Sequence, residues 1–179
     1  IERGHVYIGL PPLYKLKQGK NEQYIKDDQT LSAYLISHAV EGATLQYAPE
    51  APPINGVALE KLLAQYAAAQ EAIRRVATRF DPRVLEAMLE LPPLAGDIWD
   101  DQARLDSWGQ RLSARLASAG LGRPVYAVSL QARANDEPGL LSIERRHHGL
   151  SATQSIASSQ FTSAELRPLV EAATALADL

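Results

Sequence analysis

The spacing of apolar side chains divides the chain into an N-terminal block of strands and a helix, a helical middle, and a C-terminal block of strands. In the first block, apolar and polar residues alternate on either side of a turn that contains Gly19, which predicts a hairpin. Beyond Asp28 the period becomes helical as far as Gly42, a residue type that often ends helices. The pattern predicts strands at 6–8, 13–17, 23–26 and 43–47, and a helix at 29–40.

The middle block reads as helical throughout. A proline-rich segment, 48–54, precedes it and is the best candidate for a linker. Its first helix carries an apolar residue at every third or fourth position from Leu59 to Phe80, which we interpret as a core face rather than an oligomer interface. Asp81 followed by Pro82 is typical of an N-cap and a first helical residue. The pattern predicts helices at 56–79, 81–91 and 100–119.

The last block returns to a period of two, which predicts a half-buried strand through Tyr126, Val128 and Leu130. Two further strands, at 140–146 and 150–156, and a capping box of Thr162 and Glu165 before a terminal helix follow from the same kind of pattern. Because helices and strands are segregated along the chain, the sequence favours an α+β fold. We expect a short hairpin and helix, then a helical segment, an antiparallel meander and a terminal helix.

Composition adds limits to this picture. The chain has 179 residues, of which 46% are hydrophobic and 22% charged, as in ordinary globular proteins. Its net charge of -3 excludes a surface that is basic throughout, although not a local basic patch. The absence of cysteine excludes disulfides and thiol chemistry, and fits a reducing compartment. No apolar run is long enough for a membrane helix. Because the chain starts at Ile1 rather than Met, we expect an excised segment of a longer protein.

Most of the lysines lie in the predicted hairpin, at Lys15, Lys17, Lys20 and Lys26, and Tyr14 interleaves with them. Two interpretations remain open. The lysines are either solvated charges that protect a sheet edge, or a ribbon that contacts phosphate groups, since Lys15 and Lys17 project from the same strand face.

Other candidate groups have simpler explanations. Adjacent strand residues point to opposite faces, so His147 and His148 are a poor metal site. The acidic cluster of Asp97, Asp100 and Asp101 suits a helix N-terminus. No nucleotide-binding, metalloprotease or serine-hydrolase motif is present. The sequence therefore offers no catalytic residue and no metal ligand.

Three segments near the start resemble the B subunit of DNA gyrase, a bacterial type IIA topoisomerase: Gly4–Ile8, Pro11–Lys15 and Gln23–Asp28. In that family they close the Toprim domain. The family usually has Gln where this chain has Leu10, a change that is conservative in size. The remainder is similar to the insert of proteobacterial gyrase B subunits, through the segments Glu41–Leu45 and Ala58–Leu62 and through Phe161.

The resemblance implies a C-terminal part of a Toprim domain at 1–45, and at 46–179 an insert domain that is incomplete at its C-terminal end. The family's Toprim glutamate, its paired magnesium-binding aspartates and its ATPase domain would precede Ile1. No catalytic or metal residue can therefore be transferred to this chain, which we expect to be inactive alone. For the parent enzyme the family implies ATP and Mg²⁺.

The implied partners are double-stranded DNA, the gyrase A subunit and the rest of the B subunit. The implied location is the cytoplasm, and no contact with a membrane is implied. Two hypotheses follow. The chain contacts DNA, with Lys15, Lys17, Lys20, Lys26 and Tyr14 as the DNA-binding residues, or it is a structural buttress between gyrase domains without direct DNA contact. An unrelated α+β adaptor is a third, blander interpretation.

Overall fold

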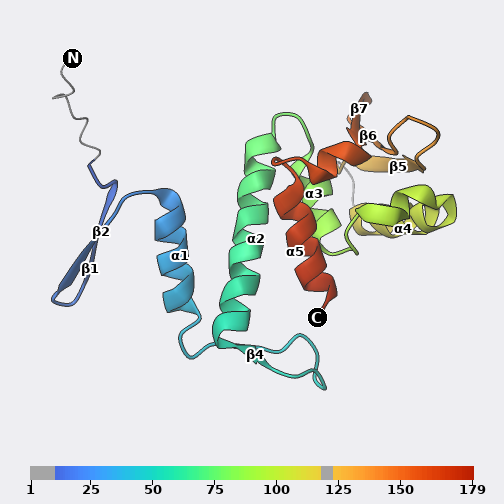
Figure 1. Ribbon diagram of the computed structural model, residues 1–179. Coiled ribbons are helices and arrows are strands. Elements are labelled where there is room, and N and C mark those ends of the chain that lie inside the picture. The colour runs from blue at the N-terminus through green and yellow to red at the C-terminus, as the bar shows by residue number, and fades with distance from the viewer. Residues whose placement is uncertain (1–10, 118–122) are drawn as a thin grey trace, which may run out of the picture. The chain divides into compact units, whose positions relative to one another are not determined.

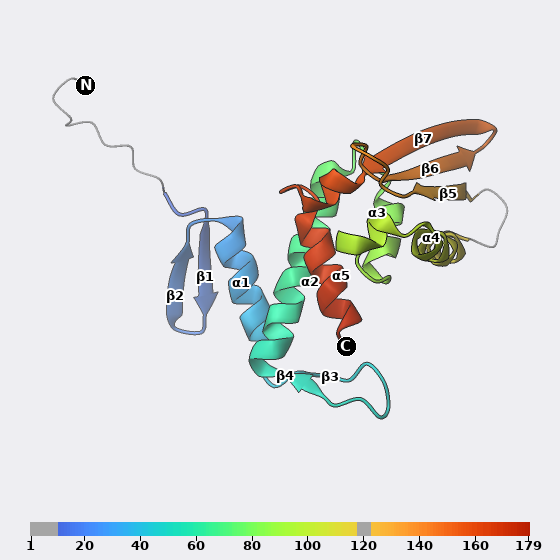
Figure 2. The same ribbon diagram turned by 45° about the vertical axis from the view of Figure 1, so that its right-hand side comes forward.

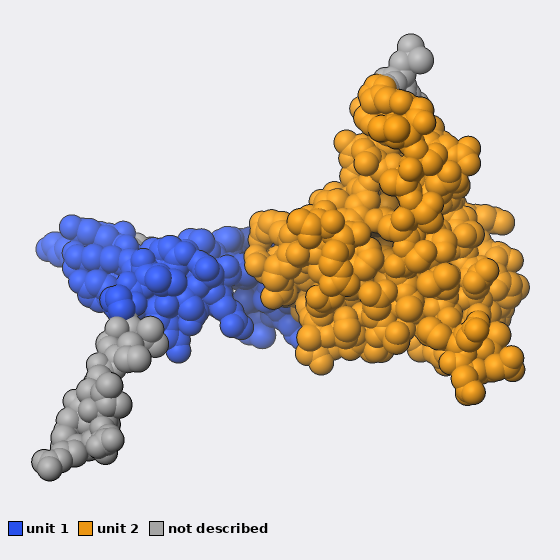
Figure 3. All heavy atoms as spheres, turned by 90° about the horizontal axis from the view of Figure 1, so that it is seen from above, with its two compact units in different colours: residues 1–64 blue, residues 65–179 orange. Residues whose placement is uncertain are grey.

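The computed structural model describes residues 11–117 and 123–179, and its elements are drawn in Figure 1. The chain forms two units, residues 1–64 and residues 65–179, which Figure 3 distinguishes by colour. Each unit is described by itself below. The predicted strand at 6–8 and the predicted C-terminal end of the 100–119 helix lie outside the described residues.

The first unit begins with the predicted hairpin. Strands β1 (Tyr14–Gln18) and β2 (Asn21–Ile25) pair antiparallel, from Tyr14 opposite Ile25 to Gln18 opposite Asn21. Gly19 has a φ of +62°, in the left-handed region that glycine adopts without steric cost, so it allows the tight turn. Ile25 is buried on one face of the hairpin. The turn predicted at Gly19 is therefore confirmed.

Helix α1 (Asp28–Ala39) follows at once. The carboxylate of its N-cap, Asp27, accepts a hydrogen bond from the amide of Thr30 at 2.7 Å. Hydrogen bonds from the side chain of Thr30 and from this amide lower the pKa of Asp27. Beyond α1, strand β3 (Thr44–Leu45) pairs with β4 (Ile54–Asn55). The proline-rich segment thus joins two paired strands inside the first unit, where the sequence suggested a linker.

Helix α2 (Gly56–Val76) begins in the first unit and ends in the second. Its seam is buried from Leu59 to Val76, as expected of a core face, except at Tyr66, which is 43% exposed. Burial of this seam stabilises a helix whose alanine-rich sequence already favours helical structure.

Two further helices line the core of the second unit. Helix α3 (Pro82–Leu89) is capped by Asp81, as predicted, and buries Val84, Leu85, Met88 and Leu89. A 3₁₀ helix, η1 (Gly96–Asp100), precedes α4 (Gln102–Leu116). The cap of α4 is Asp101, whose carboxylate accepts from the amide of Arg104 at 3.1 Å. Predicted inward positions of α4 from Leu105 to Leu116 are buried.

Strands β5 (Val125–Gln131), β6 (Leu140–His147) and β7 (Leu150–Ala157) form the antiparallel meander, in that order. Leu130, Leu141 and Ile156 lie opposite one another in register and are buried, so they share the core face. Helix α4 packs against β5 on the sheet (Figure 2). In the same core the rings of Trp99 and Phe161 lie 5.8 Å apart.

The chain ends with a 3₁₀ helix, η2 (Ser158–Thr162), and α5 (Arg167–Ala177), which packs against α3. The predicted capping box is wrong, because α5 begins after Leu166 without a side-chain cap. Thr162 instead donates to the carbonyl of Ser159 at 2.9 Å. The elements and their order confirm the predicted α+β fold, with a hairpin and helix, further helices, a three-stranded meander and a terminal helix.

Candidate functional site

The lysine hairpin is formed by β1 and β2 and includes Lys15, Lys17, Lys20 and Lys26. Lys15 and Lys17 lie on the face opposite to buried Ile25, as the alternation of a strand requires. Lys20 occupies the turn and Lys26 follows β2. The face opposite to Ile25 is therefore exposed and rich in lysine.

Not all of this charge is free. The ammonium of Lys15 lies 2.7 Å from the carboxylate of Glu22 and 5.7 Å from the ring centre of Tyr24, so it has partners within the hairpin. Lys17, Lys20 and Lys26 make no ion pair with any residue in the described part of the chain. Because Lys26 adjoins the negative charge of Asp27, the exposed ammonium groups of Lys17 and Lys20 are the ones most available to an external anion.

Tyr14 belongs to the other face of the hairpin, which it shares with Ile25. Its hydroxyl donates a hydrogen bond to the carboxylate of Asp28 in α1. This bond and the negative charge of Asp28 raise the pKa of Tyr14. The structure thus ties Tyr14 to α1 and does not bring it together with Lys15 and Lys17.

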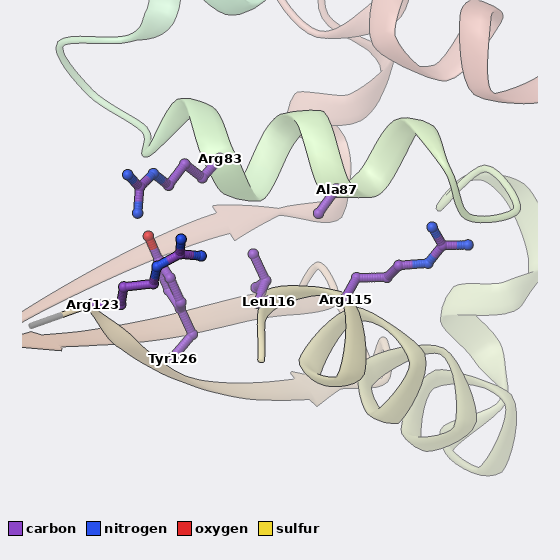
Figure 4. A pocket seen from close by; sticks show the side chains of 6 residues that line it. All are labelled: Arg83, Ala87, Arg115, Leu116, Arg123 and Tyr126. Atoms are coloured by element: carbon purple, nitrogen blue, oxygen red, sulfur yellow. The ribbon is translucent and has the colours of Figure 1, made fainter. Parts of the chain in front are cut away.

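A second cationic surface lies in the second unit, and sequence reasoning missed it. Arg83, Arg115, Arg123 and Tyr126 line a hollow of about 390 Å³ (Figure 4). A neighbouring hollow of about 640 Å³ shares Arg83, Arg123 and Tyr126 with it and continues past Arg145. We call the two hollows the arginine groove. Its arginines come from α3, α4, β6, the residues just before β5 and the segment between α2 and α3, where Arg79 pairs with Glu165. No sequence motif connects them.

Asp81 lines this groove and makes several interactions. Its carboxylate accepts from the amide of Arg83 at 3.0 Å and from the hydroxyl of Tyr126 at 2.9 Å, and lies 3.5 Å from the guanidinium of Arg145. Its own amide donates to the side-chain carbonyl of Gln154 at 2.8 Å. Partial burial, followed by the hydrogen bond to Asp81, raises the pKa of Tyr126, and the charges of Arg145 and Arg83 oppose that rise.

The acidic cluster is used within the fold. Arg104 donates to the carboxylate of Asp97 at 2.9 Å and lowers its pKa, while Arg133 pairs with Asp100 at 3.1 Å. Asp101 caps α4. Among the described residues no group of three or more histidine or acidic side chains is placed to hold a metal ion.

The two adjacent histidines do not point to opposite faces. Their ring centroids lie 3.9 Å apart, because His148 has a φ of +50° and leaves the strand for the turn between β6 and β7. The alternation argument failed here because it applies only to residues that are both within a strand.

Within residues 11–117 and 123–179, none of the helices combines the length and the apolar character that a membrane span requires.

Comparison with known proteins identifies the family. Residues 43–179 match the family described as DNA gyrase B subunit insert domain, and residues 12–40 match that described as GyrB, hook. The first match spans well over half of the chain, which therefore belongs to the DNA gyrase B subunit insert domain family. The division of the chain at residue 45 stays a prediction.

Individual relatives agree with this assignment. The chain is 38% identical over 86 residues to the DNA gyrase B subunit of Caulobacter vibrioides, a match that covers 48% of this chain and 11% of that protein. It is 29% identical over 103 residues to the DNA gyrase B subunit of Rickettsia bellii, covering 58% and 13%. For the DNA gyrase B subunit of Helicobacter pylori the identity is 48% over 46 residues, covering 26% and 6%. The chain thus spans only a small part of the length of these relatives.

Proposed function

We propose that this chain is a non-catalytic part of a DNA gyrase B subunit that supports DNA binding and couples moving domains during ATP-dependent negative supercoiling. The observation that carries the proposal is the family match over residues 43–179, together with the hook match at residues 12–40. Its partners would be double-stranded DNA, the gyrase A subunit and the rest of the B subunit, in the bacterial cytoplasm. In this proposal the hairpin lies near DNA and the insert acts as a buttress.

The DNA role of the hairpin rests on its free lysines. Exposed ammonium groups attract phosphates without reading sequence, and each phosphate contact releases counterions from the duplex. Lys17 and Lys20, which have no ionic partner in the described residues, would contribute most. Lys15 would contribute less because Glu22 already neutralises it in part.

The test replaces Lys15, Lys17 and Lys20 with Ala in the complete gyrase. Binding to duplex DNA is measured at several salt concentrations, for several DNA sequences. We expect weaker binding to every sequence and a salt slope about two to three units less steep, given a change of about 0.9 for each lost phosphate contact. A control variant with Lys61, Arg75 and Arg111 replaced by Ala removes the same charge from exposed helix positions. Equal affinity and slope in the two variants would reject the DNA role of the hairpin.

A purely structural role is a second candidate, and α1 supports it. None of the residues of α1 is buried, although it carries Leu31, Leu35 and Ile36, and Leu35 is 54% exposed. Leu31 and Ile36 are only partly buried, and a helix whose apolar side chains are this incompletely covered in the described chain suits packing against another protein surface. In this role, Leu35→Glu on α1 in the complete gyrase would raise the ATP consumed per supercoil introduced, and deleting residues 49–179 would do the same for the insert. Unchanged supercoiling and ATP use in both variants would reject the structural role.

ATP and Mg²⁺ would act elsewhere in the subunit. The acidic cluster offers no free ligands, because Asp97, Asp100 and Asp101 are engaged by Arg104, Arg133 and the first turn of α4. We therefore propose no magnesium ligand in this cluster and assign no reaction step to this chain.

A further inference from the structure

Two arginines, Arg83 and Arg123, line both hollows of the arginine groove. Figure 4 shows Arg83, from the first turn of α3, and Arg123, just before β5, reaching toward each other near the hydroxyl of Tyr126. Arg115 lies further along the same hollow, at the end of α4, and Arg145 lines the neighbouring one. The cations thus follow one another along the groove rather than surround a single point.

The fold balances the positive charge of the groove only in part. Three of its arginines have a carboxylate partner: Arg79 pairs with Glu165, Arg115 with Glu90 and Arg145 with Asp81. Among the described residues, neither Arg83 nor Arg123 has one. Asp81 is already engaged by a helix N-terminus and a hydroxyl in addition to Arg145. Two like charges that approach each other repel, and an anion placed between them removes this cost.

The type of cation suits phosphate. Apart from His147, every basic side chain that lines the groove is an arginine, and a guanidinium offers a planar fork of donors that binds a phosphate through two parallel hydrogen bonds. The groove is also open and extended, since its two hollows share three of the residues named above. A row of cations in an extended groove matches a polymer with regularly repeated phosphates better than it matches a single small anion.

We infer that the arginine groove binds the phosphodiester backbone of double-stranded DNA, with Arg83 and Arg123 as the principal contacts. This inference rests on the proposed function and adds to it a second DNA contact, in the part that we otherwise describe as a buttress. The groove contacts the backbone and reads no base sequence, because guanidinium–phosphate contacts position a protein without specifying bases.

The test uses the full 179-residue chain and a labelled duplex, with binding measured by fluorescence anisotropy from low to moderate salt. The test variant is Arg83→Gln with Arg123→Gln. Neither side chain has an ionic partner in the described residues, so we expect its unfolding curve to match that of the wild type. The control is Arg75→Gln with Arg111→Gln, which removes the same charge from exposed positions of α2 and α4 outside the groove.

Loss of two phosphate contacts lowers the salt slope by about 1.8, and at about 0.1 M salt weakens binding roughly 60-fold. The control should change affinity less than about two-fold, because exposed charges outside the contact are screened. Equal binding by the test and control variants, or no binding by the wild-type chain at low salt, would overturn the inference.

A parallel measurement separates this inference from the proposed role of the hairpin. If the variant with Lys15, Lys17 and Lys20 replaced by Ala binds DNA weakly while the groove variant binds like its control, DNA binding by the groove is rejected and DNA binding by the hairpin is supported. The reverse result supports the groove and rejects the hairpin.

Two further probes address other anions. Polyglutamate represents an acidic protein segment, and inorganic pyrophosphate represents a free phosphate compound. Suppose that Arg83→Gln with Arg123→Gln weakens binding of either probe but leaves DNA binding unaffected. The groove would then bind that anion, and the DNA assignment would be overturned. Failure of both probes to displace the duplex supports a site that needs an extended backbone.

Discussion

Removing the carboxylate of Asp81 tests whether this residue of the arginine groove is the structural junction between α3 and the sheet. In Asp81→Ala, α3 loses its N-cap, which costs about 1 kcal/mol. The partly buried hydroxyl of Tyr126 loses its acceptor, which costs about another 1 kcal/mol. The half-exposed Arg145 loses an ion pair worth less than about 1 kcal/mol. The free energy of unfolding should therefore fall by roughly 2–3 kcal/mol, if these separate costs add.

The assay is urea denaturation followed by tryptophan fluorescence. Trp99 and Trp108 are the only tryptophans and are both buried in the second unit, so the signal reports the unfolding of that unit. The denaturant slope should not change, since the substitution exposes little new surface. The backbone at position 81 remains anchored by its hydrogen bond to Gln154.

A double-mutant cycle with Tyr126→Phe isolates the hydrogen bond. The single Phe variant should lose about 1 kcal/mol, and the double variant should lose about 1 kcal/mol less than the sum of the two single losses, because the same bond is counted in both. Additivity within about 0.3 kcal/mol would refute the reasoning, since it would mean that the Asp81–Tyr126 bond contributes nothing.

Three other predictions concern the second unit and use the same denaturation assay. Gly139→Ala should lower the free energy of unfolding by about 1–3 kcal/mol, because the added Cβ would lie 2.4 Å from the buried ring of Trp99. Gly109→Ala should lower it less, because the nearest atom is the terminal methyl of Leu130 and alanine favours a helix. The fold raises the pKa of Tyr126, so the protonated hydroxyl contributes fully to the free energy of unfolding below pH 10, and this contribution is lost as the pH rises through the folded pKa. The free energy of unfolding should therefore fall at alkaline pH, and it should fall less in Tyr126→Phe. Leu112→Ala, at a fully buried site, should cost about 2–5 kcal/mol, while an exposed leucine such as Leu150 should tolerate alanine with a loss below about 0.5 kcal/mol.

Local sequence signals predicted the elements well, because each depends on residues close together in the chain. Gly19 marked the hairpin turn, and Asp81 with Pro82 marked the start of α3. The seam of α2 is confirmed as a core face apart from Tyr66. The same local reasoning failed at the predicted capping box before α5. The motif was present, but its glutamate, Glu165, accepts two hydrogen bonds from Arg79, 86 residues earlier in the chain.

The candidate sites show the same limit. The lysine hairpin was visible in the sequence because its cations fall within a few residues of one another. The arginine groove was not, because Arg83, Arg115, Arg123 and Arg145 come together only when α3, α4 and the sheet pack. No periodicity within a single element encodes that meeting, so only the tertiary structure reveals it.

Net charge is a poor guide to where such a chain meets an anion. The overall charge of -3 includes many cations and carboxylates that neutralise each other locally, as Arg104 does with Asp97, Arg133 with Asp100 and Arg146 with Glu144. Within about a Debye length a phosphate is affected mainly by the charges that remain unpaired. In the described residues these include Lys17 and Lys20 on one unit and Arg83 and Arg123 on the other. An acidic chain can therefore present two cationic surfaces, and the salt dependence of binding, rather than the isoelectric point, is the property that tests them.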